Sequence, residues 1–162
     1  MTSHVPDSTD IRILRELQND GRLTNVELAR RSNLSPAACL ERVMRLTADG
    51  FITGYAAVLD PSKLGAGLLV FVEVVLDRTT PDGFEDFKRA VLKMPQVMEC
   101  HMVAGGFDYL VKARVRDMEA YRDFLGTFLT AARGVRETHT YVVMEEVKNT
   151  TAIPLKGTAP AG

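Results

Sequence analysis

Helix start and stop signals between Thr24 and Gly50 constrain the fold more than any other stretch of this chain. Thr24 precedes Glu27 by three residues, the capping-box spacing at which each side chain can bond the other residue's backbone N–H. Ser35 followed by Pro36 marks a second helix start, because serine caps free N–H groups and proline presets φ at the first helical position. Gly50 stands where this second helix is expected to stop.

Only a short turn separates the two predicted helices. It contains Asn33, and asparagine is one of the few residues other than glycine that readily adopts the left-handed conformation of a sharp turn. Apolar residues recur at the spacing that two crossing helices would bury, namely Val26, Leu28, Ala29, Leu34, Leu40, Val43 and Leu46. Two short helices with a tight turn between them predict a helix-turn-helix.

The surface left on the outside of this motif is basic. Five arginines and two glutamates lie between Arg22 and Leu46, although the whole chain has a net charge of −1. Arginines and small side chains on a recognition helix are suited to phosphates and base edges in the major groove. The residues expected to bind double-stranded DNA are Arg30, Arg31, Ser35, Pro36, Ala37, Ala38, Cys39, Arg42 and Arg45. A solvated arginine face on an ordinary helical hairpin is the alternative that the helix pair leaves open.

Residues before and after the motif extend this domain. Asp7 and Asp10 resemble a helix start, and an apolar stripe from Ile11 to Leu17 predicts a first helix that completes a three-helix head. Residues 51–59 are expected to form an extended connector. Asp60-Pro61 and two nearby glycines then mark a domain boundary.

The second half changes to a strand pattern. Residues 68–76, 97–103, 109–115 and 135–148 are expected to be strands, with a turn at 104–108. Two amphipathic helices are expected after caps at Thr80-Pro81 and Asp117, the second ending at Gly134. Strand, helix, strand, strand, helix, strand is the ferredoxin-like βαββαβ arrangement, so the predicted fold class is α+β.

Two helices cover only one face of such a sheet. A second subunit would cover the other face, so the sequence predicts a dimer. The candidate residues for this open face are Glu73, Cys100, Met102, Tyr141 and Val143.

Several other classes of protein are disfavoured. Cys39 and Cys100 are too few and too far apart for a disulfide framework, and the three histidines lack partners at ligand spacing, so we expect no metal and no cofactor. No signal peptide and no apolar run of about 18 residues is present, so we expect a cytoplasmic protein that does not enter a membrane.

Segments in both halves resemble the Lrp/AsnC (feast/famine) family of transcription regulators. They are Asn25-Val26-Glu27-Leu28, Cys39-Leu40-Glu41-Arg42-Val43, Leu69-Val70-Phe71-Val72-Glu73, Phe107-Asp108-Tyr109-Leu110 and the run from Thr140 to Lys148. The resemblance covers roughly residues 7–150. It implies a winged-type helix-turn-helix domain (1–50), a β-strand linker (51–67), a ferredoxin-like RAM domain that binds ligand and oligomerises (68–150), and a flexible tail (151–162).

The resemblance also implies partners and a second site. Family members form homodimers that assemble into tetramers or octamers, and they bind a small amino acid between subunits. By this resemblance we expect a bacterial, nucleoid-associated protein with a leucine-like effector as the first candidate. The effector-binding residues carried over to this chain are Met102, Gly105, Gly106, Phe107, Asp108, Tyr109, Met118, Tyr141, Val142 and Val143. Glycine N–H groups suit an α-carboxylate and Asp108 suits an α-ammonium. The alternative is that Gly105-Gly106 only makes the turn and Asp108 only caps it.

Four positions, in three places along the chain, depart from the leucine-responsive pattern of the family. Ala37-Ala38 replaces Thr-Pro, Met44 replaces an arginine of the recognition helix, and Gly106 replaces an aspartate beside the effector. The first two changes bear on the operator sequence and the third on the identity of the effector.

Two functions from different classes remain. The favoured one is a sequence-specific DNA-binding regulator of amino-acid metabolism, which is not an enzyme. The alternative is a small dimeric ferredoxin-like enzyme, or an amino-acid-binding module without DNA binding, which is disfavoured because no nucleophile, base pair or metal set is visible.

Overall fold

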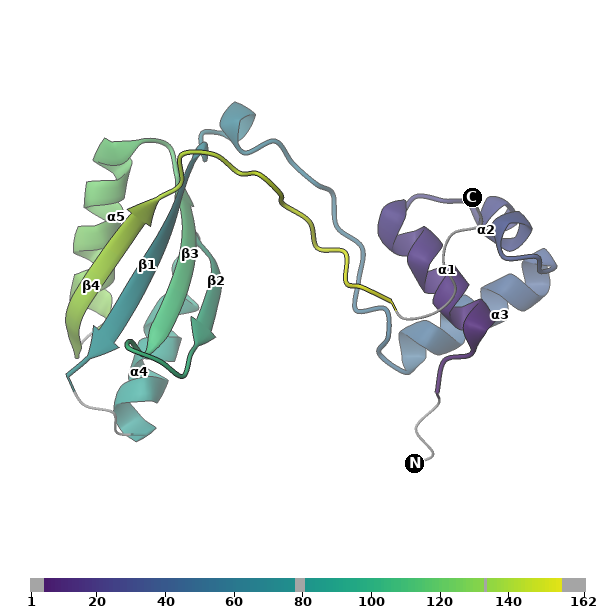
Figure 1. Ribbon diagram of the computed structural model, residues 1–162, viewed down its shortest axis with the longest axis horizontal. Helices are drawn as coiled ribbons and strands as arrows, with labels where there is room; N and C mark the ends of the chain where they lie inside the picture. Colours follow the sequence, from purple (N-terminus) through teal and green to yellow (C-terminus); the bar gives the residue numbers. More distant parts are fainter. Residues whose placement is uncertain (1–4, 78–80, 133, 156–162) are drawn as a thin grey trace. The chain divides into compact units, whose positions relative to one another are not determined.

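The computed structural model describes residues 5–77, 81–132 and 134–155. The chain divides into two compact units, Met1–Val58 with Asn149–Gly162, and Leu59–Lys148 (Figure 1). Each unit has its own hydrophobic core. Within the described ranges, no helix is both long enough and apolar enough to cross a membrane.

The first unit is a head of three helices, α1 (Ser8–Asn19), α2 (Asn25–Arg31) and α3 (Pro36–Ala48). Apolar residues from all three helices meet in its core, namely Ile13, Leu28, Ala29, Cys39 and Leu46. The predicted helix-turn-helix with a preceding helix is therefore confirmed.

The predicted caps explain where these helices begin. Asp7 and Asp10 form a complete capping box, with N···O distances of 2.8 and 3.2 Å. Thr24 accepts from the N–H of Glu27 at 3.3 Å, and Ser35 accepts from the N–H of Ala38 at 3.2 Å. Asn33 has φ of 55° and Gly50 has φ of 78°, so the turn and the helix stop are left-handed as predicted.

The burial predicted for the motif is wrong at three positions. Val26 and Leu40 are 67% and 50% exposed, whereas Cys39, expected on the outside, is 0% exposed. Cys39, Val43 and Leu46 recur at i, i+4 and i+7 and belong to the head's core cluster. Leu40 follows Cys39 by one residue, which turns it by about 100° away from that stripe.

The segment after the head contains no β-strand in this single chain. Residues 52–60 are extended, and a one-turn 3-10 helix follows at Ser62–Leu64. The strand character expected for this linker is absent because an extended segment becomes a strand only beside a hydrogen-bonded neighbour.

The other end of the chain belongs to the head unit. Gln18 donates to the carbonyl of Ile153 at 3.1 Å and accepts from its N–H at 3.2 Å. The tail predicted from residue 151 is thus held at Ile153, and residues 156–162 lie outside the described ranges.

The second unit is the predicted βαββαβ domain. Its elements are β1 (Leu68–Leu76), α4 (Pro81–Val91), β2 (Val97–Met102), β3 (Tyr109–Val115), α5 (Met118–Ala131) and β4 (Val135–Val142). The strands are antiparallel in the order β2-β3-β1-β4. This arrangement confirms the α+β ferredoxin-like class.

Details of these elements follow from local bonding. Asp117 caps α5 by accepting from Ala120 N at 2.9 Å, as predicted, whereas the expected cap at Thr80 lies outside the described residues. β4 ends at Val142 rather than at residue 148. The N–H of Val143 still bonds the carbonyl of Leu69 at 3.0 Å, but β1 begins one residue before Leu69 and offers no partner beyond that point.

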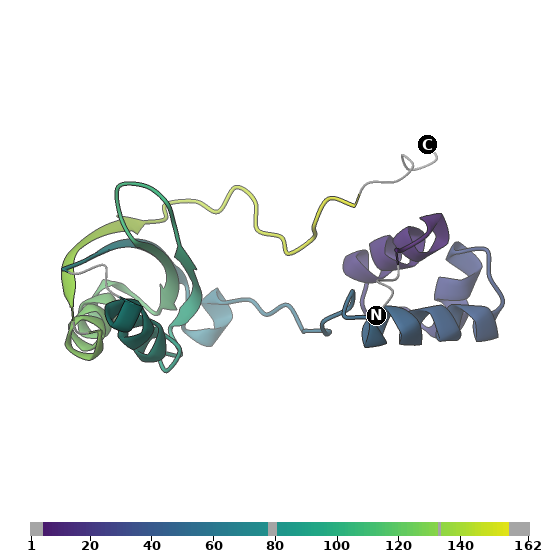
Figure 2. The ribbon, with the colours of Figure 1, turned by 90° about the horizontal axis from the view of Figure 1, so that it is seen from below.

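Both helices lie against one face of the sheet (Figure 2). The core on that face contains Val70, Val72 and Val74 from β1 with Phe87 from α4 and Phe128 from α5. Because side chains alternate along a strand, the residues between them point to the opposite, open face.

Strand register places the residues expected on the open face. Glu73 lies opposite His139, and Tyr141 lies opposite Phe71, on the face away from the helices. Cys100 is opposite the core residue Val111 and packs against the core, so its assignment to the open face is wrong. Met102 is opposite buried Tyr109 and is also on the helix side, where its place at the end of β2 leaves it exposed.

Replacing Phe87 should destabilise the sheet unit strongly. Phe87→Ala leaves a cavity beside Tyr109, whose ring centroid is 4.4 Å away, and should lower the free energy of unfolding by about 3–5 kcal/mol. Urea unfolding followed by circular dichroism measures this loss. Leu92→Ala, at an exposed position, is the control and should change stability by less than about 0.5 kcal/mol. Equal losses in the two variants would contradict the packing described above.

Candidate functional site

The first turn of α3 is open to solvent. Ser35, Pro36 and Ala37 are exposed, and Ala38 is half-buried. The side chain of Asn25 donates to the carbonyl of Pro36 at 2.7 Å, which ties the first turn of α2 to the first turn of α3. The small side chains leave the start of α3 accessible to a large partner.

Cys39 does not belong to this surface. Its side chain is fully buried on the side of α3 that faces the core of the head, so its assignment as a DNA-binding residue is wrong. Burial also raises the pKa of its thiol.

Two arginines of α2 lie beside a shared carboxylate. Arg30 and Arg31 bond Glu27 at 2.6 and 2.7 Å, and Arg31 also bonds Glu16 at 3.1 Å. The hydrogen bonds from Arg30 and Arg31 lower the pKa of Glu27 to about 2. Arg30 keeps 71% of its side chain exposed, so it remains accessible to a phosphate despite this pair.

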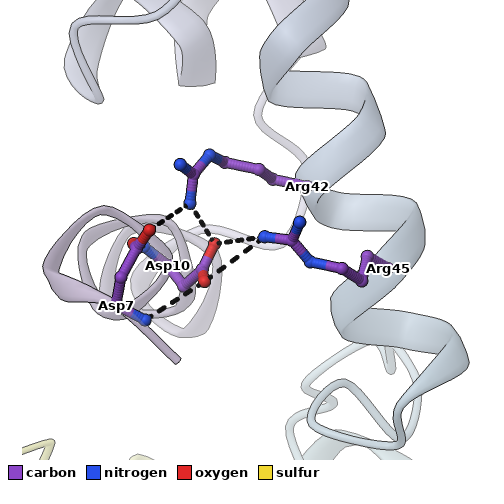
Figure 3. A network of polar contacts seen from close by, with 4 residues as sticks. All are labelled: Asp7, Asp10, Arg42 and Arg45. Carbon is purple, nitrogen blue, oxygen red and sulfur yellow. Dashed lines mark hydrogen bonds and ion pairs between the residues drawn. The ribbon is translucent and has the colours of Figure 1, made fainter. Parts of the chain in front are cut away.

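The two arginines of α3 point toward the start of α1 (Figure 3). Arg42 Nη1 lies 2.7 Å from Asp7 Oδ2 and 2.8 Å from Asp10 Oδ1. Arg45 Nη2 lies 3.4 and 3.5 Å from the two oxygens of Asp10. We refer to Asp7, Asp10, Arg42 and Arg45 as the aspartate–arginine cluster.

Charge pairing keeps both carboxylates of this cluster ionised. The hydrogen bond from Arg42 holds the pKa of Asp7 below its usual value. Burial pushes the pKa of Asp10 upward, but the bonds from Arg42 and from the Asp7 backbone outweigh it, and the net shift is downward. The spacing of Asp7 and Asp10 identified a helix cap in the sequence, but nothing in it indicated that both would reach α3.

The candidate effector residues fall into two groups. The first group lies around the turn between β2 and β3. Added Cβ atoms at Gly105 and Gly106 would meet no atom within 4 Å, so no neighbour crowds this turn.

Asp108 fixes the turn to the end of β1. Its N–H donates to the carbonyl of Val74 at 2.9 Å, and its Oδ2 accepts from the N–H of Leu76 at 2.7 Å. The side chain of Asp108 therefore bonds the end of β1 rather than the turn for which the sequence left a capping role open. Oδ1 of Asp108 has no hydrogen-bond partner in the described part of the chain.

Tyr109 is not a surface residue. It is 2% exposed and packs between Phe84 and Phe87, so its side chain belongs to the core and its assignment as an effector-binding residue is wrong. Its hydroxyl is buried without a hydrogen-bond partner among the described residues.

The second group lies at the opposite end of the sheet. Met118 follows β3. Tyr141 and Val142 end β4, and Val143 comes directly after it, beside the first residues of β1. β3 runs from one group to the other, and its seven residues span about 20 Å. A single chain therefore does not bring the two groups together.

Electrostatics distinguish the second group. Tyr141 is half exposed. The charge of neighbouring Glu73 and, to a lesser extent, burial raise the pKa of its hydroxyl.

Across the described ranges, no three His, Cys, Asp or Glu side chains form a cluster suited to a metal ion.

Two family models match this chain. The winged helix-turn-helix DNA-binding model matches residues 6–53, and the Lrp/AsnC ligand-binding domain model matches residues 69–153. These matches fall on the head and on the ferredoxin-like unit, respectively.

Curated relatives and solved structures agree with the models. Leucine-responsive regulatory proteins of Escherichia coli K12 and Salmonella typhimurium are 56% identical over 150 residues, 93% of this chain and 92% of theirs. A transcriptional regulator from Neisseria meningitidis, solved as its L-Met complex, is 42% identical with a TM-score of 0.89, covering 93% of this chain and 97% of that one. An AsnC family regulator from Agrobacterium tumefaciens is 32% identical, with the same TM-score and coverage.

These relatives are transcription regulators, so they give no support to the alternative of an enzyme on the ferredoxin-like unit. The family models account for both units of the structure. The chain belongs to the Lrp/AsnC family of DNA-binding transcription regulators.

Proposed function

We propose that this chain regulates genes of amino-acid metabolism and that a small amino acid, bound between subunits, changes how it binds DNA. The proposal rests on one combination of features in a single chain. The head is a helix-turn-helix in which the first turn of α3 is exposed, and the sheet unit carries candidate effector residues at its two opposite ends. The relatives are bacterial, which supports action in the cytoplasm at the nucleoid.

The DNA-contacting surface comprises the exposed residues around α3. Pro36 has no N–H, and the N–H groups of Ala38 and Cys39 already bond Ser35, so the N–H of Ala37 is the one offered to a phosphate oxygen. The small side chains allow close approach to the major groove. Arginines of α2 and α3 contact the phosphate backbone. The proposed contact residues are Arg30, Arg31, Ser35, Pro36, Ala37, Ala38, Arg42 and Arg45.

The open face of the sheet is the proposed dimer surface. It presents Phe71, Glu73 and Tyr141, and the helices α4 and α5 lie against the other face. A second copy of the chain covers this face, and dimers associate further into tetramers or octamers. Such assembly brings the turn at 104–108 of one subunit near the opposite end of the sheet in another.

The effector is proposed to be a small amino acid with an unbranched or branched apolar side chain. Relatives include proteins named for leucine and one solved with L-Met, which supports these two amino acids as first candidates. The unpaired Oδ1 of Asp108 would accept from the α-ammonium, and backbone N–H groups at Gly105 and Gly106 would donate to the α-carboxylate. Met118 and Val142 from another subunit would contact the side chain.

Linkage explains how the effector acts. A ligand that binds between subunits favours the assembly in which its site is complete. The assembly then sets how many heads bind neighbouring operator sites at once, which changes the overall affinity for DNA.

Removing one exposed arginine of α2 should weaken DNA binding. For Arg30→Ala we expect the log–log dependence of affinity on salt to become shallower by about 0.9, because one phosphate contact is lost. Fluorescence anisotropy of a labelled duplex across a salt series measures this slope. Arg116→Ala on the sheet unit also removes an exposed, ion-paired arginine and should leave the slope unchanged. Failure of the wild-type chain to bind any duplex at low salt would refute the proposed function.

Leucine or methionine should stabilise the chain against heat in a concentration-dependent way. The one-site law gives about 2.7 kcal/mol at a ligand concentration of 100 times Kd. A thermal-shift screen against the common amino acids identifies the ligand. Asp108→Asn keeps an oxygen to accept from Leu76 but removes the charge, so it should weaken binding by about tenfold or more. An unaltered response in Asp108→Asn would place the effector elsewhere.

A further inference from the structure

The aspartate–arginine cluster has a feature that the proposed contacts do not use. A single nitrogen, Nη1 of Arg42, is shared by two carboxylates at 2.7 and 2.8 Å (Figure 3). Arg42 is one of the arginines proposed to bind DNA, yet its charge is already paired within the head.

The two carboxylates differ in their access to solvent. Asp10 is 0% exposed, so separating its charge from Arg42 and Arg45 would leave a buried carboxylate poorly compensated, at a high cost in stability. Asp7 is 51% exposed, so water or another anion can replace it on Arg42 at little cost. The inner aspartate is a permanent partner and the outer one is exchangeable.

A DNA phosphate has the chemistry to replace the outer aspartate. Arginine binds carboxylate and phosphate oxygens with the same N–H groups and a similar geometry. Asp7 would lose one charged partner on exchange, but it would remain solvated and would still cap α1 through Oδ1, which accepts from Asp10 N at 2.8 Å.

We propose that Asp7 competes with DNA phosphate for Arg42, and that Asp10 is a positioning residue that holds Arg42 and Arg45 for either partner. The inference rests on the proposed function, because it requires α3 to meet DNA. Asp7 thereby lowers the affinity of the free head for DNA of any sequence.

A matched pair of variants tests the competition. Asp7→Asn keeps the helix cap, since asparagine caps as well as aspartate, but removes the competing charge. Asp20→Asn makes the same charge change at the other end of α1, where Asp20 accepts from the N–H of Arg22. In the full chain, Asp7→Asn should raise affinity for a non-specific duplex about two- to fivefold at low salt, and Asp20→Asn should not.

Two further variants separate competition from general electrostatics and from folding. The gain from Asp7→Asn should vanish in an Arg42→Ala background. Asp10→Asn also removes a negative charge but should weaken binding, because Arg42 and Arg45 lose the group that orients them. If Asp10→Asn does not fold, as judged by circular dichroism, the comparison of Asp7→Asn with Asp20→Asn still decides the matter.

The outcomes distinguish this inference from the proposed function. Equal effects of Asp7→Asn and Asp20→Asn, or a gain that persists without Arg42, would overturn the competition while leaving DNA binding intact. Absence of DNA binding by the wild-type chain and all variants would overturn both.

Discussion

A four-stranded sheet with helices on only one face is the constraint on which the rest of this structure depends. The side chains on its core face pack against α4 and α5, whereas Phe71 and Tyr141 lie on the opposite face, which the sheet unit leaves uncovered. The strand order also places the turn at 104–108 and the end of β4 about 20 Å apart. An effector that contacts both ends therefore requires more than one subunit, and the binding of such an effector would be coupled to assembly.

The head obeys a second constraint, which is electrostatic. The buried carboxylate of Asp10 is balanced by two arginines of α3, and it also accepts from the N–H of Asp7 at 3.2 Å. The same contacts link α3 to the start of α1, so the helix proposed to contact DNA is oriented by the arginines that are proposed to bind phosphate. Replacing both arginines would leave the buried Asp10 carboxylate without its two cationic partners, and any loss of DNA binding would then reflect misfolding as well as lost contacts.

Local signals in the sequence predicted most of the secondary structure, and long-range pairing accounts for what they missed. The caps at Asp7, Thr24 and Ser35 and the left-handed Asn33 depend on neighbouring residues, so they are readable from the chain. The burial of Cys39 and the exposure of Leu40 depend on the rotation of α3 within the head, which apolar spacing leaves ambiguous. The same holds for Tyr109 and Cys100, whose side of the sheet is set by strand register.

Mixed oligomers test most directly whether the effector site is shared between subunits. Chains carrying Asp108→Asn and chains carrying Met118→Ala each lack one half of the proposed site, and each should bind the amino acid weakly alone. Isothermal titration of co-expressed hetero-oligomers should recover a fraction of wild-type sites, because some sites then combine two intact halves. If mixing restores no sites, the two halves do not act across subunits and the account is contradicted.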